Sequence, residues 1–77
     1  MTIEEFKNSK EYADIVEKIK SYSVGFVFTI PYYKMTQKQI NGMNIVTLDC
    51  IKSGILESLS IDLDIHGNPT EKKFKRI

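Results

Sequence analysis

The spacing of apolar and polar residues predicts a helical N-terminal segment. From Ile3 to Ser21 most apolar side chains recur three or four positions apart, the spacing of a helix that buries one face. Thr2 stands before this segment and Glu5 follows three residues later, which is the sequence of a capping box. Asn8 and Ser9 compete for backbone hydrogen bonds and favour a break with a new start. We therefore expect a helix over Ile3–Ser21, in one or two pieces.

The residues from Val24 to Ile30 alternate in the manner of a strand. Val24, Phe26, Phe28 and Ile30 share one face, and the residues between them make the other face partly apolar. Pro31 has no N–H to donate to a ladder, so it ends the strand or marks it as an edge.

The segment 36–53 supports two interpretations. Thr36 to Gln39 again reads as a capping box, most of the following apolar residues share one broad face of a helical wheel, and Gly54 suits the end of a helix. Alternatively, Asn41-Gly42 forms a tight hairpin turn that leads into a strand, which the β-branched run Ile45-Val46-Thr47 favours. We prefer the helix because the wheel and both caps agree.

From Leu59 to His66 apolar and polar residues alternate, as in a strand with one buried face, and the sequence predicts a hairpin. His-Gly-Asn-Pro is a turn signal, and Thr70 to Ile77 forms the returning strand. We expect a register that places Ile61 opposite Phe74 and Asp62 opposite Lys73, one apolar and one ionic pair.

These elements predict an α+β fold in a single domain over residues 1–77. The expected order is α-β-α-β-β, with two helices packed on one face of a small three-stranded sheet. The alternative is an N-terminal helix followed by a four-stranded antiparallel meander. The lysine-rich last strand is expected at one edge, blunted by its charge, and the apolar strand Val24–Ile30 at the other edge, where it needs cover.

Composition narrows the functional classes. The chain has 77 residues with 11 basic and 10 acidic side chains, and this balance argues against a protein that mainly coats nucleic acid or anionic lipid. Cys50 is the only cysteine, so no disulfide framework is expected. No apolar run approaches the roughly 20 residues that cross a bilayer, and the N-terminus does not resemble a leader. We expect a cytoplasmic protein that makes no membrane contact.

The pattern D-x-D-x-H is the chain's best candidate for chemistry. On a strand Asp62, Asp64 and His66 share one face, and carboxylates with an imidazole can bind Mn²⁺, Fe²⁺ or Zn²⁺. A site would need ligands from elsewhere, and His66 is the only histidine. The favoured interpretation is a solvated strand face with no metal. Cys50 is expected to be a buried apolar residue, and neither a cofactor nor enzymatic activity is expected.

Two surfaces are candidates for binding. The first is the strand Val24–Ile30 with the residues that follow it. We expect this surface to bind a protein partner by edge pairing, in a regulatory role. The partner could be a second copy of the chain, which would make a homodimer. The residues of this surface are Phe26, Phe28, Tyr32, Tyr33 and Lys34. The alternative is an accessory protein that binds nucleic acid through the basic last strand, by phosphate contacts. Its residues are Lys72, Lys73, Lys75 and Arg76.

Overall fold

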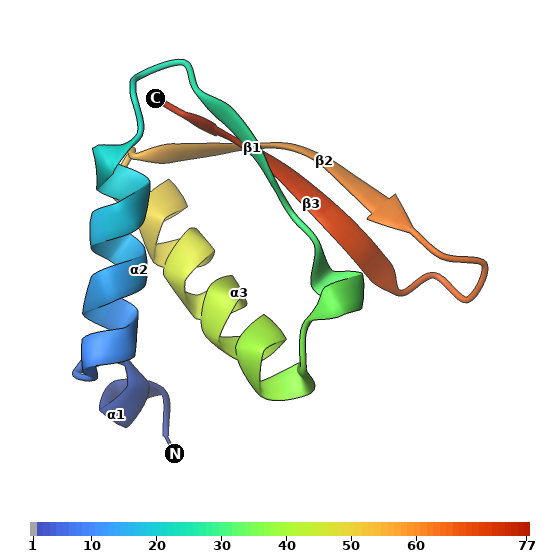
Figure 1. Cartoon of the computed structure of the whole chain (residues 1–77), viewed down its shortest axis with the longest axis horizontal. Helices are drawn as coiled ribbons and strands as arrows, with labels where there is room; N and C mark the ends of the chain where they lie inside the picture. The colour runs from blue at the N-terminus through green and yellow to red at the C-terminus, as the bar shows by residue number, and fades with distance from the viewer. Residues whose placement is uncertain (1) are drawn as a thin grey trace.

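The structure is a computed structural model that describes residues 2–77. Its helices lie on one side of a three-stranded antiparallel sheet (Figure 1). The elements in chain order are α1 (Ile3–Lys7), α2 (Lys10–Ser21), β1 (Val27–Ile30), the 3₁₀ turn η1 (Tyr32–Lys34), α3 (Gln37–Lys52), β2 (Leu56–Leu63) and β3 (Pro69–Arg76). The predicted α+β order is confirmed, and the four-stranded meander is wrong because residues 37–52 are helical.

The N-terminal helix is in two pieces because a second cap starts α2. Thr2 Oγ1 accepts a hydrogen bond from the Glu5 N–H at 3.1 Å and caps α1. The chain leaves the helix at Asn8, and Ser9 Oγ accepts from the Tyr12 N–H at 3.2 Å. Each hydroxyl satisfies an N–H that has no partner in the first turn of a helix.

In α3 the capping box is complete. Thr36 Oγ1 accepts from the Gln39 N–H at 3.2 Å, and Gln39 Oε1 accepts from the Thr36 N–H at 2.9 Å. The β-branched run does not prevent the helix, because Val46 is fully buried and the Thr47 hydroxyl donates to the Met43 carbonyl at 2.8 Å. Burial here outweighs a local strand preference of a few tenths of a kcal/mol per residue.

The strand order is β1-β3-β2, with β3 antiparallel to both neighbours. β1 is an edge, as expected, but the lysine-rich β3 is central, and its predicted edge position is wrong. The central place suits Phe74, which is 2% exposed and stacks on Phe28 with ring centroids 5.8 Å apart. The lysines of β3 do not prevent its central position, because their long aliphatic side chains place the ammonium groups in water.

The predicted hairpin register is also wrong. Phe74 pairs with Ser58, Lys73 with Ser60, and Asp62 with Glu71. The prediction assumed a tight turn, whereas β2 ends at Leu63 and the chain returns through residues 64–68. Two irregularities in the ladder, one on each strand, shift the register in opposite directions and cancel over the hairpin, so the difference from the prediction arises at the turn.

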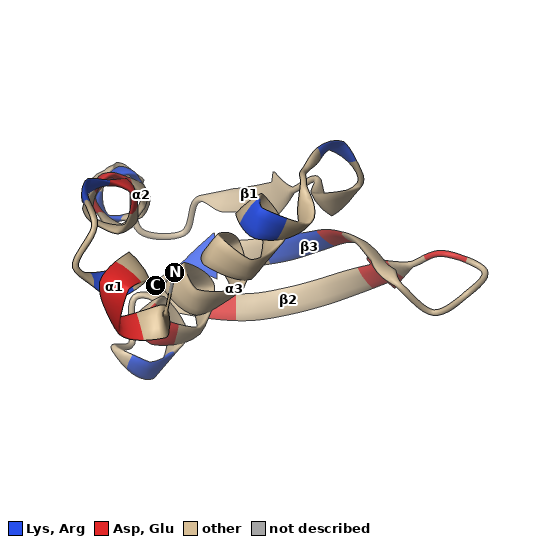
Figure 2. Ribbon diagram, turned by 90° about the horizontal axis from the view of Figure 1, so that it is seen from below, with Lys and Arg blue, Asp and Glu red and all other residues tan. Residues whose placement is uncertain are grey.

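The core lies between the helices and one face of the sheet. Its buried apolar residues are Phe6, Ile19, Ile30, Tyr32, Val46, Cys50, Leu56 and Phe74. Among residues 2–77 no helix covers the other face of the sheet, and the far end of the β2–β3 hairpin extends past α3 (Figures 1 and 2). The molecule is therefore a thin two-layer body with extents of 35 × 33 × 19 Å.

Candidate protein-binding surfaces

The outer edge of β1 has unpaired backbone groups. The Arg76 N–H donates to the Phe26 carbonyl at 2.8 Å, and Phe28 pairs with Phe74. Backbone groups on an antiparallel strand alternate between its two sides. The Phe26 carbonyl and the backbone groups of Phe28 therefore face β3, and the backbone groups of Val27 and Thr29 face solvent.

Aromatic side chains line the helix side of this edge. The Tyr22 ring lies 4.8 Å from the ring of Phe26 and 5.0 Å from that of Phe28, measured between centroids. Phe28 is partly buried and Phe26 is exposed. The cluster joins α2 to β1 and leaves apolar area beside the unpaired backbone.

The two tyrosines that follow β1 have opposite environments. Tyr32 is 3% exposed, and its hydroxyl donates to Asn44 Oδ1 at 2.9 Å. Burial raises the pKa of this tyrosine. Tyr33 is 60% exposed, and the Lys34 ammonium lies 5.6 Å from its ring centroid. Tyr32 is thus a core residue, and Tyr33 with Lys34 remains on the surface at the end of β1.

The four basic residues of β3 do not form one patch. The partners of Lys73 and Lys75 in the ladder are exposed residues of the uncovered face, whereas Lys72 and Arg76 alternate to the helix side. Lys72 Nζ donates to Asn44 Oδ1 at 3.2 Å, and Arg76 Nη1 donates to the Ile55 carbonyl at 3.4 Å. Glu57 pairs with Lys75 across the ladder, so acidic groups interrupt the remaining pair of lysines.

The three residues of the D-x-D-x-H pattern are not on one strand face. Asp62 lies in β2, but Asp64 and His66 lie in the turn beyond it. Asp64 Oδ1 accepts from the N–H groups of His66 at 2.8 Å and Asn68 at 3.0 Å, so this carboxylate shapes the turn. Across residues 2–77, no three or more His, Cys, Asp or Glu side chains are grouped so that they could hold a metal ion.

Cys50 is 2% exposed on the inner face of α3. Burial, followed by the nearby Asp49 charge, raises the pKa of its thiol. A buried, protonated thiol is a poor nucleophile, in agreement with its predicted packing role.

A shallow groove of about 690 Å³ lies between α1 and the first half of α3. Ile3, Phe6, Gly42 and Ile45 contribute its apolar surface. Neither the histidine nor the cysteine lines it.

The sequence pattern did not predict a second surface, at the junction of α3 and β2. Leu48 and Ile51 of α3 and Ile61 of β2 line one groove there, and all three are exposed. Leu63, also exposed, lies two residues beyond Ile61 and so on the same side of β2. We call these four residues the α3–β2 strip. The only sequence signal for it is that the apolar face of residues 40–51 is wider than a small sheet can cover.

Comparison with protein-family models, with curated proteins and with solved structures finds no match to this chain. Within residues 2–77, no helix has both the length and the apolar character that spanning a membrane requires.

Proposed function

We propose that this chain is a non-enzymatic binding protein that captures an extended segment of another protein along β1. The observation that carries the proposal is the unpaired backbone of Val27 and Thr29 beside the exposed rings of Phe26 and Tyr33. A regulatory role follows from such binding when capture of the segment withholds it from other partners.

Strand addition supplies the binding energy and the register. A partner strand can make up to about four backbone hydrogen bonds with Val27 and Thr29, two for each residue. Its side chains on the helix side would cover Phe26 and the part of Phe28 that is still exposed. Pro31 ends the pairing, so the bound segment is about four to six residues long.

The residues beyond Pro31 add specificity. Tyr33 offers a large ring at low cost in side-chain entropy, and Lys34 beside it carries a positive charge. A partner segment with an acidic residue at this end would gain an ion pair. We therefore expect bound segments to combine alternating apolar residues with one acidic end.

The test uses a peptide library displayed on phage and selected on the immobilised protein. Enriched peptides are synthesised, and their affinity is measured by fluorescence anisotropy for the wild type and two variants. Thr29→Pro removes the outward N–H without removing a bond to β3, and Thr29→Val keeps that N–H.

We expect Thr29→Pro to weaken peptide binding by at least about ten-fold, because it deletes a hydrogen bond and leaves a partner carbonyl unpaired. Thr29→Val should bind within about two-fold of the wild type. Equal affinity for the proline variant and the wild type, or no enrichment of alternating apolar peptides, would contradict the proposal.

A further inference from the structure

β2 is a second open edge, and it is twice as long as β1, with eight residues against four. In β3 the backbone groups of Phe74 and Arg76 face β1, so those of Lys73 and Lys75 face β2. The backbone groups of their partners in β2, Glu57 and Ser60, face β3 in turn. The N–H and C=O of Ile61, next along β2, therefore face solvent.

Apolar side chains lie beside this free backbone. The exposed fractions in the α3–β2 strip range from 38% for Ile51 to 58% for Leu63. Ile61, Leu48 and Ile51 surround a groove of about 240 Å³ that reaches Phe74. The strip is thus continuous with the core and lies beside the free outer edge of β2.

β2 has one feature that protects edge strands, the ladder irregularity between Ser58 and Ser60, but it lacks the basic side chains and the proline that usually do so. Its sequence, LESLSIDL, contains no lysine, arginine or proline. Its two acids, Glu57 and Asp62, pair with Lys75 and Glu71 of β3, on the face of the sheet away from the strip. Neither acid would therefore be buried when a partner covers the strip.

We propose that a second copy of this chain covers the strip, with the two β2 strands paired antiparallel across a two-fold axis. The two sheets then form one sheet of six strands. Pairing centred on Ile61 puts Ile61 against Ile61, Leu59 against Leu63 and Ser60 against Asp62. The outward backbone groups of the two Ile61 residues bond to each other, and the two strips meet on the helix side.

A second copy suits this surface because an isologous interface must complement itself. In the register centred on Ile61 every apolar residue meets an apolar residue, and Glu57 lies outside the paired segment. A register that set Glu57 against Asp62 would oppose two acids twice, and that repulsion disfavours slippage.

The size of the chain also favours a dimer. A domain of this length buries a smaller share of its surface than larger domains do, so it gains most from an added core. A standard interface covers about 800 Å² of each partner, roughly 15% of the 5285 Å² exposed here. Residues 59–63 of β2 supply the paired backbone of this interface, and the exposed Leu48 and Ile51 of α3 supply the adjoining apolar area.

Sedimentation velocity from about 1 µM to about 500 µM protein tests the inference, since this range spans moderate dimer affinities. The wild type should approach twice its monomer mass of 8.9 kDa as concentration rises. Ile61→Lys should remain monomeric throughout, because it places two ammonium groups at the two-fold axis. Ile65→Lys, a matched change at a turn residue that is 95% exposed, should dimerise as the wild type does.

Leu48→Glu is the second variant, and it changes an exposed helix residue, so the monomer fold is retained even if Ile61→Lys unfolds. It should weaken dimerisation at least about ten-fold. A wild type that is monomeric at every concentration, or equal dimerisation of Leu48→Glu and the wild type, would overturn the inference.

Thr29→Pro separates the two edges. It should leave the β2 dimer intact while it weakens peptide binding at β1. Loss of the dimer in Thr29→Pro, with retention in Leu48→Glu, would place the dimer at β1 and overturn the inference without removing β1 as a binding edge.

Discussion

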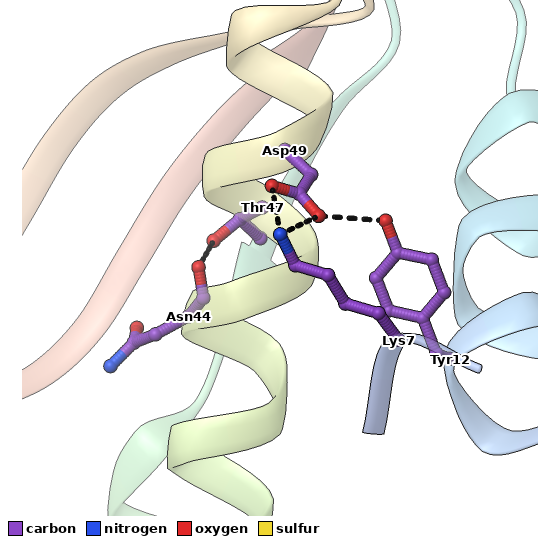
Figure 3. A network of polar contacts seen from close by, with 5 residues as sticks. All are labelled: Lys7, Tyr12, Asn44, Thr47 and Asp49. Carbon is purple, nitrogen blue, oxygen red and sulfur yellow. Dashed lines mark hydrogen bonds and ion pairs between the residues drawn. The ribbon is translucent and has the colours of Figure 1, made fainter. Parts of the chain in front are cut away.

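At the scale of single residues, Asp49 joins the N-terminal helices to α3 (Figure 3). Asp49 Oδ2 accepts from the Tyr12 hydroxyl at 2.8 Å and lies 3.3 Å from Lys7 Nζ. The hydrogen bond from Tyr12, followed by Lys7, lowers the pKa of Asp49, and partial desolvation opposes this. The same hydrogen bond is the largest of the causes that raise the pKa of Tyr12 to about 12.

Tyr12→Phe should lower the free energy of unfolding by about 1 kcal/mol at neutral pH, since a hydrogen bond to a carboxylate is lost. The pKa of Asp49 is lower in the folded chain than in the unfolded chain. The stability this contributes is present above the ordinary pKa of 3.8 and is lost as pH falls through the folded value. Urea denaturation should therefore show a smaller difference between variant and wild type in acid than at neutral pH. An undiminished difference in acid would contradict this assignment.

At the scale of elements, the helices could be predicted and the sheet only in part. Thr2, Ser9 and Thr36 are local signals, and each caps a helix in the structure. Strand order depends on which strand gains most from having a neighbouring strand on each side. For β3 this gain depends on Phe74, which pairs with Phe28 of β1 and with Ser58 of β2. The hairpin register depends on where β2 ends, and the alternation of residues 59–66 does not indicate that the chain leaves the strand at Leu63.

Contact between α1 and α3 depends on a glycine. A Cβ built on Gly42 would lie 3.0 Å from Cζ of the buried Phe6 ring. Gly42→Val should destabilise the fold by about 2 kcal/mol, because the branched side chain displaces that ring. Valine has a higher helix propensity than glycine, so propensity cannot explain a loss at Gly42, and Lys38→Val shows what valine costs at an exposed position of the same helix. Thermal denaturation measures both variants, and equal losses would show that Gly42 is not needed for this contact.

At the scale of the whole molecule, one sheet face is covered by helices, and both edges are open. A strand in this region and its role as an edge could be anticipated from the sequence, but β1 covers only Val27–Ile30 of the predicted Val24–Ile30. The burial of Tyr32 and the exposure of Tyr33 could not be anticipated, because both rings follow the same proline. The η1 turn is what directs Tyr32 into the core and Tyr33 to the surface. The α3–β2 strip could not be anticipated either, because it depends on where α3 lies over the sheet.

The two edges differ in a way that separates their partners. β1 is short, bounded by Pro31 and flanked by aromatic rings, which suits a short segment of another protein. β2 is long, flanked by aliphatic side chains and self-complementary, which suits a second copy. We therefore propose that the chain acts by strand pairing at both edges.

Residue-resolved amide hydrogen exchange, measured by NMR, reports pairing at each edge separately. In dilute protein without peptide the amides of Thr29 and Ile61 should exchange fast, because both face solvent. Raising the protein concentration should protect Ile61, and adding a selected peptide should protect Thr29. Fast exchange at both amides under every condition would contradict strand pairing at these edges.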